Sequence, residues 1–234
     1  MSAVVPTPED VHAAWADRSG EYSPAYYAHR GPDATSDAVR RWCERVVGTD
    51  ARVLELGCSS GRHLSHLHDG GFRHLEGIEV NPDAVDVMRE VYPDLAETAT
   101  VHETTMEAAL PEFGDDAFDA IYSVETLQHV HPDTAWVFDE IARVTEDLLI
   151  TAEIENEGDG ALGVPPEVNP EEEGASIDPD SAVADAGSGV NHVAEDLPLY
   201  YRNWKQVLVP RGFEQIDVET TRRDTVRAFR PPDR

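Results

Sequence analysis

The chain has very little positive charge. It contains one lysine, Lys205, and 18 basic residues against 47 acidic ones, which gives a net charge of −29 over 234 residues. A nucleic-acid partner is disfavoured, because this excess of carboxylates would repel a phosphate backbone. Dense acidic surfaces also keep proteins hydrated in concentrated salt, where ions screen their mutual repulsion. The composition therefore predicts a protein of a halophilic cytoplasm that does not bind DNA or RNA.

Cysteines and long apolar runs are also scarce. The two cysteines, Cys43 and Cys58, are too few for a disulfide framework and fit a reducing compartment. No apolar run is long enough to cross a membrane, and the opening MSAVVPTPED lacks the features of a signal peptide. The length suffices for one α/β domain with a substantial core. We expect a cytoplasmic protein that is a monomer or homodimer with no membrane partner.

Residues 53–61, VLELGCSSG, are the most informative stretch. Its apolar start predicts a strand buried on both faces. The glycines and serines that follow allow a tight turn that a ligand can approach closely, and a helix is predicted from Arg62 to His68. A strand, a small-residue loop and a helix form a nucleotide-binding crevice in an open α/β sheet. A strand–turn–helix corner without a ligand is the alternative.

The spacing of this loop separates two kinds of crevice. The dinucleotide fingerprint needs glycine at its first, third and sixth positions, but Ser59 and Arg62 follow Gly57 at the last two, which disfavours an NAD-dependent oxidoreductase. Glu55 precedes the first glycine by two residues, and Gly61 follows it by four. This pattern resembles the first motif of class I S-adenosylmethionine-dependent methyltransferases. A buried acid suits the cationic ammonium and sulfonium of that cofactor better than a pyrophosphate.

Later segments resemble the later motifs of the same family, so that the resemblance extends over most of the chain. Residues 75–79, LEGIE, predict a second strand ending in Glu79, which can accept hydrogen bonds from ribose hydroxyls. Residues 101–107 predict a third strand and 118–123 a fourth. The resemblance implies a Rossmann-like, doubly wound, mostly parallel sheet of seven strands in the order 3-2-1-4-5-7-6, with helices on both faces.

The resemblance also implies roles for individual residues. The ammonium of S-adenosylmethionine is expected to lie against Glu55 and its ribose against Glu79. Its adenine is expected to lie against Thr105 and Met106. Its methionine part is expected to lie along the loop and near the end of the fourth strand, at Gly57, Cys58, Ser59, Gly61, Ser123 and Val124. Core packing is the alternative for Met106, and a solvated strand end is the alternative for Glu79.

Catalysis is less well marked. Methyl transfer needs mainly alignment and exclusion of water, and a base is required only when the acceptor must lose a proton. His129 and Glu125 follow the fourth strand and are the predicted catalytic residues, with His131 and His192 as further candidates. A histidine bonded to backbone is the alternative for His129. No metal is predicted, because His63 and His66 have no further ligands at zinc spacing and are expected on a solvated helix face.

The chain is predicted to divide into two parts. Residues 1–48 predict an N-terminal helical cap, in which Tyr26, Tyr27 and Arg30 could act as a lid over the substrate or pack as ordinary aromatics. Residues 49–234 form the methyltransferase domain. It includes an acidic, flexible insertion at about 155–196, where composition cannot bury much surface. Residues 200–221 predict the last helix, a glycine turn and the sixth strand.

Together these features predict a methyltransferase that acts on a small-molecule acceptor by in-line transfer. A non-catalytic S-adenosylmethionine-binding module is one alternative. A protein or RNA methyltransferase is another, although RNA conflicts with the charge.

Overall fold

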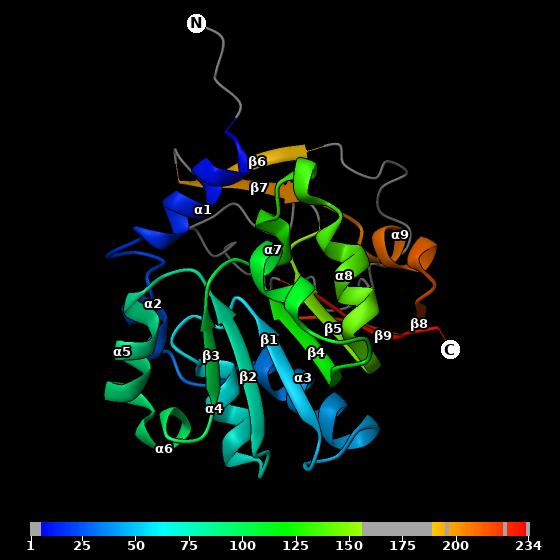
Figure 1. Cartoon of the computed structure of the whole chain (residues 1–234), viewed down its shortest axis with the longest axis horizontal. Coiled ribbons are helices and arrows are strands. Elements are labelled where there is room, and N and C mark those ends of the chain that lie inside the picture. Colours follow the sequence, from blue (N-terminus) through cyan, green and yellow to red (C-terminus); the bar gives the residue numbers. More distant parts are fainter. Residues whose placement is uncertain (1–5, 156–188, 195–196, 222–223, 233–234) are drawn as a thin grey trace, which may run out of the picture.

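A seven-stranded sheet forms the centre of the protein. In the computed structural model, which describes residues 6–155, 189–194, 197–221 and 224–232, the strand order is β3-β2-β1-β4-β5-β9-β8 (Figure 1). The bounds are Arg52–Leu56, His74–Glu79, Thr100–Glu103, Phe118–Val124 and Thr145–Glu153 for β1 to β5, then Glu214–Thr220 for β8 and Thr225–Arg230 for β9. Strands β1 to β5 are parallel, and β9 runs antiparallel to β5 and β8. Counting only the strands of this sheet along the chain gives 3-2-1-4-5-7-6, so the predicted topology is confirmed.

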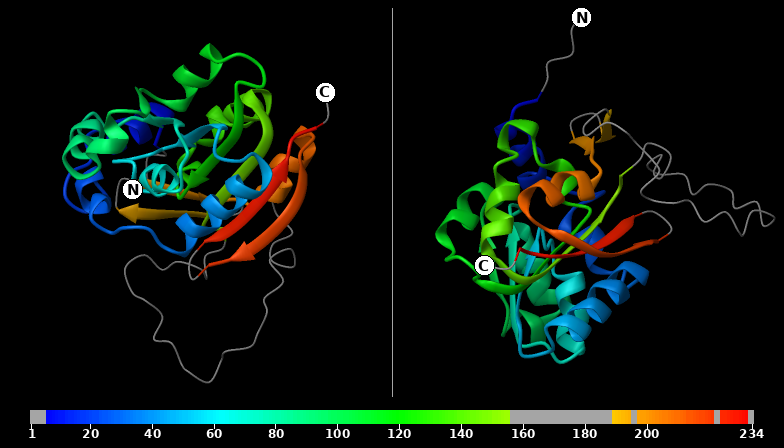
Figure 2. Two further views of the ribbon diagram at one scale, coloured as in Figure 1. Left: turned by 90° about the horizontal axis from the view of Figure 1, so that it is seen from below. Right: turned by 90° about the vertical axis from the view of Figure 1, so that its right-hand side faces the viewer.

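Helices cover both faces, because the central strands are apolar on both sides. Val53 of β1 packs in a core with α3 (Ala34–Val46), α4 (Arg62–Asp69) and α5 (Asp83–Val91). Leu54 and Leu56 point to the other face and pack with α7 (Met106–Ala109), α8 (Val137–Val144) and α9 (Trp204–Leu208). Successive side chains of a strand point to opposite faces, so one short apolar run serves both cores. Figure 2 shows the pair β9 and β8 ending the sheet on one side.

Among residues 6–51, the structure shows three helices before the first strand: α1 (Pro8–Ala16), α2 (Pro24–Ala28) and α3. Thr7 accepts from the backbone N–H of Asp10, and the Asp10 carboxylate accepts from the N–H of Thr7, a capping box that fixes the start of α1. Helix α2 packs on α5, which continues into the short α6 (Pro93–Ala96), and α1 packs on β7. The N-terminal segment thus follows the carboxyl edge of the sheet before α3 enters the core.

A second, two-stranded sheet is the main departure from the sequence prediction. Strands β6 (Gly189–Ala194) and β7 (Leu197–Tyr201) pair antiparallel beside α1 (Figure 1). The helix expected from residue 200 is therefore wrong at its start: the side chains of β7, LPLYY, are all buried, and aromatic residues favour such a strand. The helix begins only at Trp204, capped by Asn203, whose side chain accepts from the N–H of Gln206.

The predicted insertion at 155–196 falls mostly on residues 156–188 and 195–196, which lie outside the described residues. Its later part, 189–194, belongs to β6, whose backbone alone is described. Within the described ranges, none of the helices combines the length and the apolarity of a membrane span.

Candidate functional site

A cavity lies at the carboxyl ends of β1, β2 and β4, beneath the N-terminal segment. Most of the predicted site residues line it: Glu55, Gly57, Cys58, Ser59, Glu79, Thr105, Met106, Val124, Glu125, His129 and Tyr27. Gly61, Ser123, Tyr26 and Arg30 are not among the lining residues. The structure therefore brings together residues from the glycine loop and from the ends of three strands, as the topology requires.

The glycine loop has a strained backbone on the cavity side. Gly57 has φ +71° and Ser59 has φ 48°, and the second value is unfavourable for a residue with a Cβ atom. The N–H groups of Gly57 and Cys58 both donate to the carbonyl of Ile78, at 2.9 and 3.0 Å. A Cβ atom on Gly57 would lie 2.4 Å from the side chain of Thr126. Glycine is thus needed where the loop and the turn after β4 meet.

Cys58 and Gly61 support the loop from behind. The Cys58 side chain is 2% exposed and lies against Gly77, where an added Cβ would come within 2.5 Å of Sγ. Burial raises the pKa of the Cys58 thiol well above its ordinary value, so the thiol stays protonated. Gly61 has φ +82°, and a Cβ there would meet Met88 Cε at 2.6 Å. Its role is to begin α4 in a left-handed turn.

Glu55 is a carboxyl buried at the end of β1. It is 1% exposed, and Tyr122 Oη donates to its Oε2 at 2.9 Å. Burial raises the pKa of Glu55 well above its ordinary value, although the Tyr122 hydroxyl and the Arg62 charge act in the opposite direction. A cationic group placed in the cavity would favour the ionised form. The Glu55 carboxylate therefore fits a ligand ammonium, from which it can accept hydrogen bonds.

Glu79 joins the end of β2 to the glycine loop. Its Oε2 accepts from the N–H of Ser59 at 2.7 Å, and its Oε1 accepts from the N–H of Asn81 at 2.8 Å. Burial raises the pKa of Glu79, and these backbone donors lower it. Each carboxylate oxygen can accept a second hydrogen bond, so the pair of ribose hydroxyls can still be accommodated. The bond to Ser59 gives Glu79 a second role that the sequence did not indicate.

Hydrogen bonds hold the N-terminal segment over the glycine loop and the end of β2. Asn81 Nδ2 donates to the carbonyls of Trp15 and Arg18, at 3.1 and 3.0 Å, and Ser60 Oγ donates to the carbonyl of Pro24 at 3.2 Å. Aromatic and apolar side chains of the segment line the cavity: Val11, Trp15, Tyr22, Pro24 and Tyr27.

Of the three residues expected to form a lid, Tyr27 alone lines the cavity. The Arg30 guanidinium lies over the ring of Tyr26, 4.2 Å from its centroid, and hydrogen-bonds its hydroxyl. Tyr26 and Arg30 thus pair with each other beside the cavity wall.

The turn after β4 carries the two predicted catalytic residues. Glu125 has φ 50°, a second strained residue on the cavity wall. His129 lies at the end of a 3-10 turn, Leu127–His129, with its ring edge-on to Trp15 and its Nδ1 2.8 Å from the carbonyl of Pro198 in β7. A carbonyl can only accept, so Nδ1 carries the proton and Nε2 is the unprotonated nitrogen of the neutral ring. The backbone contact expected as an alternative for His129 is therefore present, and it leaves Nε2 as the acceptor nitrogen, 3.4 Å from the side-chain amide nitrogen of Gln128.

The other histidines considered above are His131, His192 and His63, and of these His63 lines the cavity. His131 Nδ1 accepts from the N–H of Asp133 at 3.1 Å, and His131 does not line the cavity. The side chain of His192 is outside the described residues. The solvated face expected for His63 is wrong, because α4 packs this residue against α3. There Nδ1 lies 2.9 Å from Ser36 Oγ, and burial lowers the pKa of His63 to about 3.

One pair in the cavity has no sequence signal at all. His12 Nε2 of α1 lies 3.1 Å from Glu107 Oε1 of α7, and the two residues are 95 positions apart. The hydrogen bond to Glu107 raises the pKa of His12. Near this pair, the indole N–H of Trp15 is buried and has no hydrogen-bond partner among the described residues. Such a group is available to a polar atom of a ligand.

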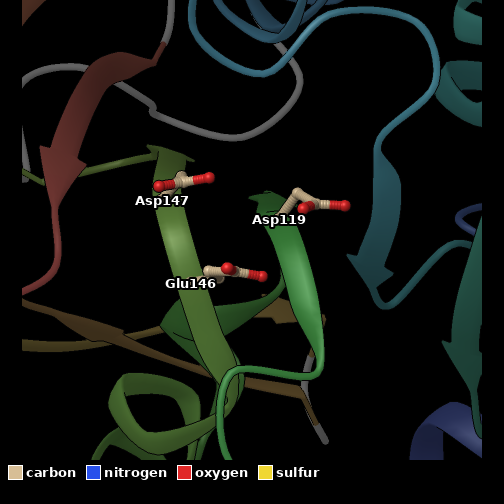
Figure 3. Close-up of side chains that lie close together, drawn as sticks. All are labelled: Asp119, Glu146 and Asp147. Carbon is tan, nitrogen blue, oxygen red and sulfur yellow. The ribbon is translucent and has the colours of Figure 1, made fainter. Parts of the chain in front are cut away.

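Away from the cavity, three carboxylates gather at the opposite edge of the sheet. Asp119, near the start of β4, lies beside Glu146 and Asp147, near the start of β5 (Figure 3). Their ligand atoms all lie within 4.8 Å of one another, and Glu146 and Asp147 are exposed. Asp119 already accepts from the backbone N–H of Arg52 at 2.6 Å. Grouped acids are expected on a surface of this charge, and no other feature of the described residues at this edge indicates a ligand.

Comparison with known proteins gives a domain match and a fold match. Residues 53–147 match the family model described as a methyltransferase domain. The O-methyltransferase cnsE of Penicillium expansum is 26% identical over 139 residues, which cover 53% of this chain and 50% of that protein. Methyltransferase GfsG of Streptomyces halstedii is 28% identical over 118 residues, 48% of this chain and 42% of that protein. The chain spans about half the length of the curated relatives it matches.

Solved structures extend the likeness to the whole chain. A 1,6-didemethyltoxoflavin N1-methyltransferase of Burkholderia thailandensis, with S-adenosylhomocysteine bound, has a TM-score of 0.67 at 15% identity over 100% of this chain and 94% of that one. The [4+2]-cyclase SpnF has a TM-score of 0.58 at 14% identity, covering 88% of this chain and 85% of that one. At these identities the likeness concerns the fold, which hosts more than one activity.

Proposed function

We propose that this chain, whose residues 53–147 match a methyltransferase-domain model, is an S-adenosylmethionine-dependent methyltransferase acting on a small molecule. One observation carries the proposal. Two carboxylates, the buried Glu55 and the partly buried Glu79, flank a strained glycine loop in one cavity at the carboxyl ends of β1 and β2. That set suits a ligand with a cationic amine at one end and a diol at the other.

Each part of the cofactor would contact a different set of cavity residues. Glu55 would face the ammonium, and the backbone of residues 57–59 would line the methionine part. Glu79 would hold the ribose, and Thr105 with Met106 would hold the adenine. Val124 and Glu125 would flank the reacting end. Gly61 and Ser123 would act indirectly, since Gly61 starts α4 and Ser123 Oγ donates to Glu153 at 2.5 Å.

Bound S-adenosylmethionine supplies a methyl group that is already activated by its sulfonium. The chain has to align an acceptor with that methyl group and exclude water, and the N-terminal segment that roofs the cavity serves both needs. Where the acceptor must lose a proton, Nε2 of His129 is the base, because Nδ1–H is held by Pro198. Glu125 would orient the acceptor beside it.

A small acceptor is supported by the aromatic lining of the cavity and by the names of the relatives. The net charge opposes an RNA acceptor. We further propose that residues 1–48 form the cap of a cytoplasmic, salt-adapted enzyme that is monomeric or homodimeric. A non-catalytic S-adenosylmethionine-binding module is the alternative that keeps every cofactor contact.

Calorimetric titration tests the cofactor assignment. S-adenosylmethionine and, in parallel, NADH are titrated into the protein in molar potassium chloride, with circular dichroism to show that the chain is folded. Micromolar binding of S-adenosylmethionine without a response to NADH is expected. Folded protein that binds no S-adenosylmethionine would overturn the proposal. Formation of S-adenosylhomocysteine with a panel of phenols and amines then separates an enzyme from a binding module.

A further inference from the structure

Glu153, the last residue of β5, is a buried carboxylate that the proposed function does not use. It is 0% exposed and does not line the cavity. Four donors converge on it: Ser123 Oγ at 2.5 Å and the backbone N–H groups of Thr126, Leu127 and Gln128 at 3.3, 3.1 and 3.3 Å. The three N–H groups belong to the turn that follows β4. One side chain therefore caps the amide side of the turn between Glu125 and His129.

Arg202, which follows β7, holds the carbonyl side of the same turn. Its guanidinium donates to the carbonyls of Leu127 and Val130, at 3.2 and 2.5 Å. The side chain of Gln128 adds a third tie, because its Oε1 accepts from the N–H of Ile154 at 3.0 Å. The amides of the turn thus face a carboxylate and its carbonyls face a cation. Each of these contacts is stronger when the side chain is charged.

We infer that Glu153 is a positioning residue whose ionised carboxylate fixes the turn bearing Glu125 and His129, and that a proton gained by Glu153 loosens this wall of the cavity. The inference rests on the proposed function only in the test that measures the binding of S-adenosylhomocysteine. Because Glu153 does not line the cavity and is bonded to Ser123 and to the turn, its effect would be transmitted through them. A proton on Oε2 would confront the N–H of Gln128, so that a charge-assisted bond is lost.

The proton is gained near neutral pH. Burial raises the pKa of Glu153 to about 7, even though all four donors lower it. Several charged groups lie on the elements packed against it. Arg202 remains a cation, since burial lowers its pKa only to about 10. Glu125 and His129 lie on the turn itself, and Asp224, before β9, is bonded to Thr35 on the far side.

The experiment compares the wild type with Glu153→Gln and with the control Glu214→Gln, an exposed acid on β8. The affinity for S-adenosylhomocysteine is measured at pH 6 and pH 8 in molar potassium chloride. We expect the wild type and Glu214→Gln to bind about tenfold more weakly at pH 6, the scale of one lost charged hydrogen bond. Glu153→Gln should bind weakly at both values. A step of equal size in Glu153→Gln, or no step in the wild type, would overturn the inference.

Hydrogen exchange of a peptide covering residues 124–131 gives a second readout that needs neither ligand nor variant. After correction for the chemical exchange rate, the wild-type amides of 126–128 should be less protected at pH 6 than at pH 8. Equal protection would overturn the inference even where Glu153→Gln fails to fold. If exchange shows the step and S-adenosylhomocysteine does not bind, the positioning role stands and the proposed function fails.

Discussion

Glu155 and Arg227 form an ion pair in the interior, and its removal gives a quantitative test of the core. Arg227 is 0% exposed; its Nε donates to Glu155 Oε1 at 2.8 Å and its Nη2 to Oε2 at 2.7 Å. Its Nη1 also donates to Gln215 Oε1 at 2.7 Å. We expect Arg227→Met to lower the free energy of unfolding by about 3–5 kcal/mol, the cost of leaving one buried charge without its partner.

The magnitude follows from what remains around Glu155. After the substitution, its carboxylate keeps the N–H of Trp204 at 3.1 Å but loses both bonds from the guanidinium. An uncompensated carboxylate in this position is penalised heavily, whereas an apolar pair of similar volume is often neutral. The double variant Glu155→Leu/Arg227→Met should therefore recover most of the loss.

Urea unfolding followed by circular dichroism, at constant molar potassium chloride, measures the difference as a shift of the midpoint at unchanged slope. A native stability of roughly 5–15 kcal/mol leaves the single variant measurable. The reasoning would be refuted by a loss below about 1 kcal/mol in the single variant. A double variant as unstable as the single one would contradict the assignment of the loss to the unpaired charge.

Three further predictions concern the cavity and its supports. Glu79→Ala should weaken S-adenosylmethionine binding by roughly 1–3 kcal/mol in calorimetry, and an unchanged affinity would reject its role. Gly77→Ala places a Cβ 2.5 Å from Cys58 Sγ and should lower stability by about 1–3 kcal/mol. Adding Cys58→Ala should restore part of that loss in the same denaturation assay. Burial lowers the pKa of His63 to about 3 in the folded protein, whereas the same group has its ordinary pKa of 6.5 in the unfolded chain. Between these two pH values the unfolded chain therefore binds more protons than the folded protein. The free energy of unfolding should therefore decrease as the pH falls through this range, by up to about 1.4 kcal/mol per pH unit. The His63→Gln variant should lack this part of the pH dependence of the wild type.

The sheet, and the fact that the glycine loop and the ends of the first strands come together at one cavity, could be predicted because their signals are local. The apolar run 53–56 and the glycine spacing after it determine a strand, a turn and a helix within a few residues. Glu79 follows at the distance that places it on the neighbouring strand, where β1 and β2 pair in parallel. Periodicity and spacing report such features directly.

The parts that were missed depend on tertiary contacts. Nothing near His12 in the sequence indicates Glu107, since their contact requires α1 to lie over the sheet. Glu153 reads as an ordinary strand end, and only the pairing of β4 with β5 brings it beneath the turn. Residues 197–201 are five buried apolar positions, a pattern too short to separate strand from helix.

The packing of Cys58 against Gly77 also determines how readily this thiol reacts with oxidants and thiol reagents. Both thiols are buried, and burial raises the pKa of Cys43 to about 12. Oxidation and alkylation proceed through an accessible thiolate, so neither sulfur can react while the native packing persists. A thiol at the centre of the glycine loop is thereby made chemically silent. Its rate of labelling measures how often the chain opens.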